Sequence, residues 1–130
     1  MYKGIVDGVN AVAGQNIAFT TAWNTNLNTR YDSGNNYIEF SNSGYYDVAV
    51  TLVVEDTTAT SIVAQLYANG TEIPTAIAQS DITATTGVRT LNITDTIKVE
   101  PSALNVLANL SVRLDSNATV TGNITVAKRK

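Results

Sequence analysis

The chain contains neither cysteine nor histidine. The absence of cysteine excludes disulfide frameworks, thiolate metal sites and thiol nucleophiles, and the absence of histidine removes the commonest general base and zinc ligand. Charged residues make up only 15% of the chain, and its carboxylates are scattered with no recognisable nucleophile beside them. We therefore predict that the protein is not an enzyme and that it carries no cofactor and no metal ion.

Clustered basic residues and long apolar runs are missing as well. The eight Lys and Arg residues are scattered, apart from the terminal Lys128, Arg129 and Lys130, and the net charge is −3. Such a chain offers no basic stripe for nucleic acid. It has no run of eighteen apolar residues for a membrane span, and residues 1–8 lack the apolar stretch of a secretory signal. We expect a protein that is made in a cytoplasm, binds no nucleic acid and does not cross a membrane.

What the chain does contain is typical of β-structure. Its 130 residues fit a single domain, 1–130, that can bury its own core. Val, Ile and Thr recur throughout, and their branched side chains favour strands. Apolar and polar residues alternate along several segments, which predicts half-buried strands. The expected strands cover residues 5–12, 16–19, 37–40, 45–54, 62–68, 89–99, 106–114 and the end of the chain after a turn at 115–117.

A hairpin is predicted at Asn69-Gly70, the pair that two-residue hairpin turns prefer. Pro74 follows closely and reduces the returning segment to an edge or irregular strand. Eight to ten short strands with turns about every ten residues indicate a sandwich or barrel. The predicted core consists of the inward residues of these strands: Ile38, Phe40, Val48, Val50, Leu52, Leu66, Leu91, Ile93, Leu110, Val112 and Ile124.

Three segments do not alternate clearly. Residues 20–36 are the longest of them and predict a functional or interfacial loop. Residues 102–110 have leucines at three-residue spacing, but so short a segment makes a weak helix, and we expect a loop followed by a strand. The run from Asp32 to Glu39 gathers oxygen ligands suited to calcium. It lacks the EF-hand pattern, so an Asn/Asp/Gly turn is the favoured interpretation.

The aromatic residues suggest two kinds of contact. One segment combines rings with clustered polar groups, and its residues are candidates for a glycan or partner contact: Trp23, Asn24, Asn26, Asn28, Tyr31 and Asp32. The other candidates lie on strand faces opposite the main apolar rows. Those faces are too apolar for full exposure to water, which predicts burial against another subunit. The predicted interface residues are Tyr45, Val53, Val63 and Tyr67.

The order of several segments resembles a known family. These segments are 12–21, 38–40, the turn Ser43-Gly44-Tyr45-Tyr46 that opens a long strand, 67–74, and the closing 124–128. Together they resemble the compact trimeric jelly roll of the tumour necrosis factor (TNF) and complement-globular-head superfamily. The small forms encoded by bacteriophages and Firmicutes are the most similar.

The resemblance implies an all-β, TNF-like jelly-roll sandwich of eight to ten antiparallel strands that assembles as a homotrimer and binds or displays rather than catalyses. We expect a bacteriophage structural protein, a capsid decoration or head fibre, located in the virion after synthesis in the host cytoplasm. Its partner is then a capsid or other virion protein. One alternative is a receptor-binding fibre-tip module that grips a host surface glycan, and another is a bacterial surface or spore-coat protein. Attachment is expected through residues 1–8 or the tail Lys128, Arg129 and Lys130.

Overall fold

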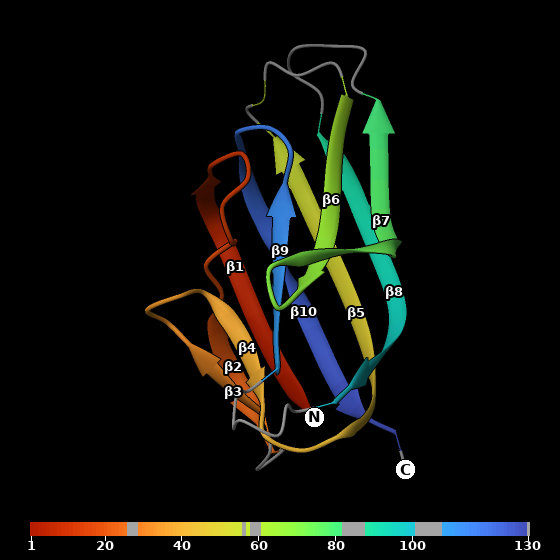
Figure 1. Ribbon diagram of the computed structural model, residues 1–130. Helices are drawn as coiled ribbons and strands as arrows, with labels where there is room; N and C mark the ends of the chain where they lie inside the picture. Colours follow the sequence, from red (N-terminus) through yellow and green to blue (C-terminus); the bar gives the residue numbers. More distant parts are fainter. Residues whose placement is uncertain (26–28, 56, 58–60, 82–87, 101–107, 130) are drawn as a thin grey trace.

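The computed structural model describes residues 1–25, 29–55, 57, 61–81, 88–100 and 108–129. The described residues form ten β-strands and no helix (Figure 1). The strands are β1 (Tyr2–Ala11), β2 (Thr20–Asn24), β3 (Thr29–Asp32), β4 (Tyr37–Phe40), β5 (Gly44–Glu55), β6 (Ser61–Ala68), β7 (Thr71–Asp81), β8 (Arg89–Val99), β9 (Ala108–Leu114) and β10 (Ala118–Lys128).

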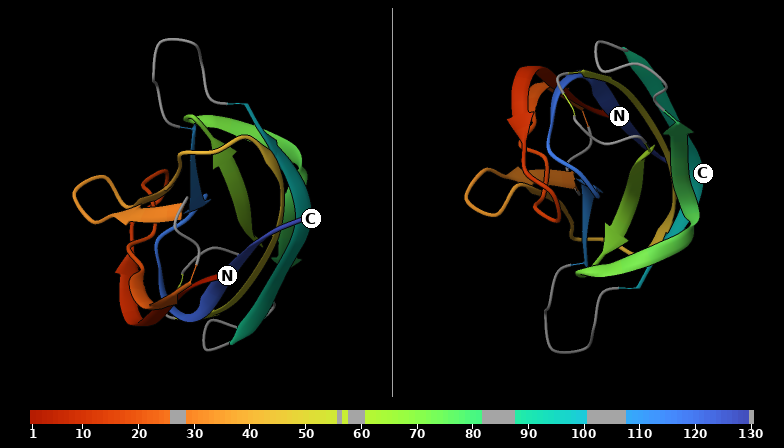
Figure 2. Two further views of the ribbon diagram at one scale, coloured as in Figure 1. Left: turned by 90° about the horizontal axis from the view of Figure 1, so that it is seen from below. Right: turned by 90° about the horizontal axis from the view of Figure 1, so that it is seen from above.

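The strands form two five-stranded antiparallel sheets. The first has the order β2-β1-β10-β5-β8 and holds both ends of the chain, so we call it the terminal sheet. The second has the order β3-β4-β9-β6-β7 and holds the β6–β7 turn, so we call it the hairpin sheet. Figure 2 shows the two layers on either side of the core. From β7 onward each strand crosses to the other sheet, which makes the sandwich a jelly roll and confirms the predicted fold class.

The core lies between the sheets, and alternation decides which side chains enter it. On β5 the even-numbered residues from Tyr46 to Val54 are buried, while the odd-numbered residues face outward. The same pattern buries Leu91 and Ile93 on β8 and Leu110 and Val112 on β9. All eleven residues of the predicted core are at most 3% exposed. The assignment of inward faces from the sequence is therefore confirmed.

The hairpin at Asn69-Gly70 is confirmed by its backbone. Asn69 and Gly70 have φ angles of 52° and 79°, and a type I′ turn requires positive φ at both central residues. β7 is an edge strand of the hairpin sheet, and its register with β6 shifts between Gln65 and Tyr67. Figure 1 shows β7 turning sharply after the hairpin. Pro74 therefore sits in the irregular edge strand that the sequence predicts.

The second predicted turn, after Asp32, is also confirmed. The Asp32 Oδ1 atom accepts hydrogen bonds from the backbone N–H groups of Gly34 and Asn35, at 2.9 and 3.2 Å. The Asn35 side-chain amide donates to the other carboxylate oxygen at 3.0 Å. Asn36 completes the turn with a positive φ of 56°. The carboxylate of Asp32 thus holds the turn that leads into β4.

Two expectations about the first third of the chain are wrong. Residues 16–19 do not form a strand: only Asn16 makes an isolated bridge, to Arg113, and the Ile17 N–H donates to the Val112 carbonyl at 2.9 Å. Ile17 and Phe19 are nevertheless buried in the core. The predicted loop 20–36 contains β2 and β3. These are short strands whose polar residues do not alternate, so pairing with β1 and β4 stabilises them. The residues of the helix-or-loop question, 102–107, lie outside the described part of the chain.

Candidate interaction surfaces

The centre of the outer face of the terminal sheet is built from short, uncharged side chains. On β5 this face carries Tyr45, Ala49 and Val53, and Tyr45 is 51% exposed. The register places Ala49 between Thr94 of β8 and Thr125 of β10. Two residues farther along β5 on the same face, Thr51 lies between two asparagines, Asn92 and Asn123. Short side chains in the middle of the sheet leave a face that another flat surface can approach closely.

The carboxylate of Asp47, which lies in this face, has partners within the same chain. The Thr96 hydroxyl donates to Asp47 Oδ1 at 2.7 Å, and Arg129 Nε lies 3.3 Å from Asp47 Oδ2. The hydrogen bond from Thr96 and the charge of Arg129 hold the pKa of Asp47 below its ordinary value. Toward the β1 and β2 side the face carries exposed apolar groups, Ile5 at 41% and Trp23 at 55%. The result is a face of small, hydroxyl-bearing and apolar groups.

The other two predicted interface residues lie on the opposite side of the molecule. Val63 and Tyr67 belong to β6 and point outward from the hairpin sheet, where both are half-buried. The guanidinium of Arg113 covers the ring of Tyr67 at 4.3 Å. The structure therefore divides the predicted interface residues between the two outer faces.

The predicted glycan segment is divided as well. Trp23 lies in β2 with Lys3 Nζ 5.9 Å from its ring. Tyr31, in β3, is turned inward: its hydroxyl accepts from the Phe19 N–H at 2.8 Å and donates to Asn36 Oδ1 at 3.1 Å. Burial raises the pKa of this phenol, so it stays a neutral bridging group. The structure does not bring Tyr31 together with Trp23.

The remaining residues of that segment have other roles or fall outside the description. Asp32 is engaged in its turn, and the Asn24 side chain donates to the Thr29 carbonyl. Asn26 and Asn28 lie outside the described residues. Trp23 is therefore the exposed ring that a ligand could reach in this segment.

The two ends of the chain lie at one end of the sandwich (Figure 1). Tyr2 pairs with Val126, and the Met1 ammonium donates to Thr25 Oγ1 at 2.9 Å. Lys128 is the last residue of β10, and the Arg129 N–H donates to the Tyr45 carbonyl at 2.8 Å. Residues 128–129 thus extend the sheet instead of forming a free tail, and Lys130 lies outside the described residues. Both candidate attachment segments share one pole.

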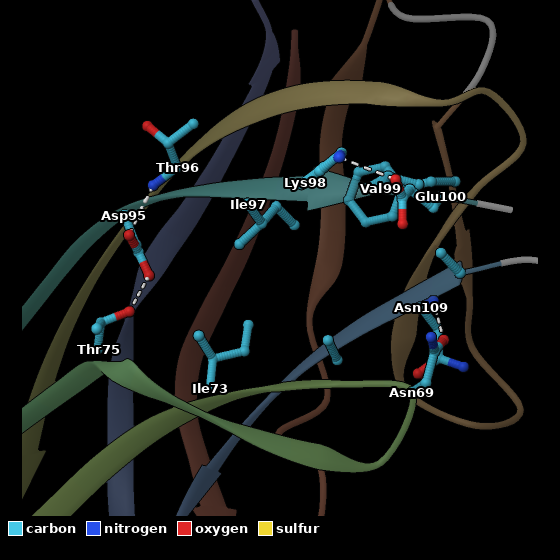
Figure 3. Close-up of a pocket in the computed structure, with 13 residues that line it drawn as sticks. Asn69, Ile73, Thr75, Asp95, Thr96, Ile97, Lys98, Val99, Glu100 and Asn109 are labelled. Atoms are coloured by element: carbon cyan, nitrogen blue, oxygen red, sulfur yellow. Dashed lines mark hydrogen bonds and ion pairs between the residues drawn. The ribbon is translucent and has the colours of Figure 1, made fainter.

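A pocket of about 270 Å³ opens where β7 and β8 meet at the edge of the sandwich. Figure 3 shows Ile73 and Ile97 facing one another across it. Asp95 accepts hydrogen bonds from the Thr75 hydroxyl at 3.0 Å and from the Thr96 N–H at 2.9 Å. Asp95 interrupts the row of apolar residues that β8 turns toward the core. Its carboxylate lies at the open edge of the sandwich, where it contacts β7 of the other sheet. The carboxylate therefore links the two sheets.

The described residues contain no group of three or more carboxylates that could hold a metal ion, and no helix long and apolar enough to cross a membrane.

Comparison with known proteins identifies the fold. No protein-family model matches the chain, and no curated protein matches it. Among solved structures, Eiger TNF from S. frugiperda superposes with a TM-score of 0.81 at 10% identity, over 99% of this chain and 91% of that chain. Two structures of murine APRIL superpose with TM-scores of 0.70 and 0.73 at 7% and 6% identity, over at least 98% of both chains. At such low identity the likeness shows the fold alone, and it confirms the TNF-like jelly roll that the sequence predicts.

Proposed function

We propose that the protein is a non-enzymatic structural protein of a bacteriophage particle, a capsid decoration or head-fibre protein, that works as a homotrimer. The observation that carries the trimer is the outer face of the terminal sheet. Tyr45, Ala49 and Val53 lie on it among threonines and asparagines, and Arg129 pairs with its Asp47. Burial against other copies removes this apolar area from water.

Three-fold symmetry restricts which two surfaces of the protein can meet in the trimer. Each contact in a cyclic trimer joins two different surfaces, and the two must be inclined to one another for the ring to close. The outer faces of the two sheets point in opposite directions, and joining them would build an open stack. The outer face of the terminal sheet can instead meet the β7–β8 edge of the next protomer. Ile77 and Val88 on this edge are 48% and 51% exposed. We therefore place the face with Tyr45 and Val53 against this edge of the next protomer.

Substitution of Ala49 by arginine tests this interface. A long cation in the middle of the flat face prevents close approach, so we expect Ala49→Arg to be a folded monomer by light scattering after size exclusion. Val63→Arg is the matched variant on the opposite face, and by the closure argument its trimer persists. An Ala49→Arg protein that remains trimeric contradicts the interface. A Val63→Arg monomer would instead assign Val63 and Tyr67 to it.

The virion role is supported by the resemblance found in the sequence and by the position of the chain ends. A trimer with its axis along the strands presents three N-termini and three copies of Lys128 and Arg129 at one pole, a suitable place for attachment. The test is immunolabelling of gradient-purified phage particles with an antibody raised against the protein. Labelled particles support the proposal, and particles free of the protein overturn it while leaving the trimer intact.

A receptor-binding module is the second candidate, because the Trp23 ring is 55% exposed and has a cation at its face. Exposed aromatic rings stack on sugars, and a glycan array tests this role directly. A signal that is lost in Trp23→Ala supports it. An array with no signal removes it.

A further inference from the structure

A polar groove of about 290 Å³ lies on the outer face of the hairpin sheet, beside Tyr67, and adjoins the β7–β8 pocket at Asn69 and Asn109. It runs along β9, between the turn that leads into β4 and the β6–β7 hairpin. The residues that line it are Asn16, Asn35, Tyr37, Asn69, Gly70, Asn109, Ser111 and Arg113. Its volume is near the lower end of small-molecule sites, about 300–1,000 Å³, and suits a single ring-sized ligand.

Arg113 is the cation of this groove, and two contacts fix its orientation. Its Nε donates to Asn16 Oδ1 at 2.8 Å, and its guanidinium lies 4.3 Å from the centre of the Tyr67 ring. Within the described part of the chain, this is its one side-chain hydrogen bond, and no ion pair includes it. The outer nitrogens of the guanidinium therefore remain as donors. A planar fork held in this way is arranged to bind a carboxylate through two parallel hydrogen bonds.

Among the described residues no carboxylate forms an ion pair with Arg113. Glu39, which lies opposite Asn109 across the strands, is bound by Arg30 at 2.6 Å, and Glu72 lies opposite Tyr67 on the strand beyond it. Arg113 thus provides a positive charge in a half-buried position where water screens it less than at an open surface.

The other walls suit a polyhydroxylated ligand. The side chains of Asn35, Asn69 and Asn109 line the groove with amide groups, and Ser111 and Tyr37 line it with hydroxyls. The Asn35 amide nitrogen already donates to Asp32, and the Asn69 oxygen accepts from the Asn109 N–H, so the Asn69 nitrogen and the Asn109 side chain are the amide groups offered to a ligand. Ser111 lies opposite Tyr67 in the ladder, so the hydroxyl and the stacked arginine belong to neighbouring rows. Amides and hydroxyls both donate and accept, which matches the hydroxyl groups of a sugar ring.

We propose that this groove binds one carboxylate-bearing monosaccharide unit, with its carboxylate on Arg113 and its hydroxyl groups on Asn69, Asn109 and Ser111. The inference goes beyond the structural role and does not depend on it. A trimer that closes through the outer face of the terminal sheet leaves this groove open on the opposite sheet.

Titration of the unmodified protein is the first test, with glucuronic acid, its uncharged methyl ester and acetate as probes. Changes in amide NMR spectra report binding and its position. We expect the acid to bind at least tenfold more tightly than the ester, because only the acid pairs with Arg113, and at least tenfold more tightly than acetate, because acetate lacks the hydroxyl groups. Equal affinity for acid and ester, equal affinity for acid and acetate, or no binding of the acid overturns the proposal.

Variants then assign the site. Arg113→Gln removes the positive charge of the groove. Asn109→Asp places a negative charge near the carboxylate of the ligand with little change of shape. Each is expected to weaken glucuronic acid binding at least tenfold. Arg89→Gln, which makes the same charge change at the start of β8 in the other sheet, is expected to leave the affinity within twofold. Thermal denaturation of each variant checks folding. Wild-type affinity in a folded Arg113→Gln protein contradicts the site.

Discussion

At the scale of the residue, Gly122 shows a constraint that alternation does not reveal. It lies in β10 opposite Leu52 of β5. The alternation of buried and exposed residues along β10 gives no sign that this position is special. A Cβ atom at this position would overlap the carbonyl of Thr51 and lie 3.0 Å from the Leu52 Cα. Backbone atoms of a central strand cannot move aside easily, so the position requires a glycine.

We therefore predict that Gly122→Ala destabilises the protein although it adds one methyl group. Overpacking of this kind costs about 1–3 kcal/mol, compared with about 2–5 kcal/mol when a fully buried leucine such as Leu52 is truncated to alanine. Urea denaturation of Gly122→Ala and Leu52→Ala measures both losses. A Gly122→Ala protein as stable as the wild type would show that the two strands are farther apart than the structure places them.

Asp32 leads to a prediction about pH. The side-chain hydrogen bond from Asn35, followed by those from the backbone N–H groups of Gly34 and Asn35, lowers the pKa of this carboxyl. A lowered pKa in the folded state means that the ionised form stabilises the fold above the unfolded pKa. That contribution is lost as the pH falls through the folded value.

We predict that Asp32→Asn loses less thermal stability than the wild type between pH 5 and pH 2. The asparagine Oδ1 can still accept the hydrogen bonds from the backbone N–H groups of Gly34 and Asn35, the bond from the Asn35 side chain to the second oxygen is lost at every pH, and the asparagine does not titrate. Other carboxyls with lowered pKa, such as Asp47, are present in both proteins, so the difference isolates Asp32. Melting curves at several pH values provide the measurement. Parallel losses in the two proteins would contradict a role for the ionised carboxylate in the turn.

At the scale of the element, strands with a buried and an exposed face could be predicted from the sequence. β5 and β8 fall within one residue of their expected limits because packing on one face produces strict alternation. β2 and β3 could not be predicted in the same way, since they are short polar strands at sheet edges, stabilised by pairing with β1 and β4. Residues 16–19 have strand-like composition, but they run beside β9 with only one bridge.

The candidate sites were harder to predict from the sequence than the strands, because their residues are brought together only by the fold. Trp23 and Tyr31 are eight positions apart in the sequence, yet they belong to different sheets. The Arg113 groove shows the reverse case, because the side chains of Asn16 and Arg113 meet across 97 residues of sequence. No local pattern marks such a pair. The cation stacked on Tyr67 could be recognised only after β6 and β9 were paired.

The end of β10 carries a prediction about attachment. Replacing Lys128 and Lys130 by glutamine removes two positive charges from each chain and keeps Arg129, whose charge is paired with Asp47 and whose N–H donates to the Tyr45 carbonyl. We expect the fold and the trimer to persist, and binding to phage particles to weaken at low salt, where charge attraction is strongest. Co-sedimentation with particles at low and high salt measures the effect. Unchanged binding under both conditions excludes the basic end and leaves residues 1–8 as the attachment segment.

At the scale of the whole molecule, the two outer faces of the sandwich differ in character. The terminal sheet presents small and apolar groups around Ala49, and the hairpin sheet presents a groove lined with asparagines around Arg113. Both ends of the chain lie at one pole. This division favours an assembly in which the terminal sheets are buried, one pole attaches, and the hairpin sheets remain free to meet a ligand.

The measurement that tests this account most directly is sedimentation equilibrium of the wild-type protein at micromolar concentration. The account predicts a single species with three times the 13.8 kDa mass of one chain, with no change over a tenfold dilution. A mass of one chain across that range would contradict it, because the outer face of the terminal sheet would then be exposed to water in the native protein.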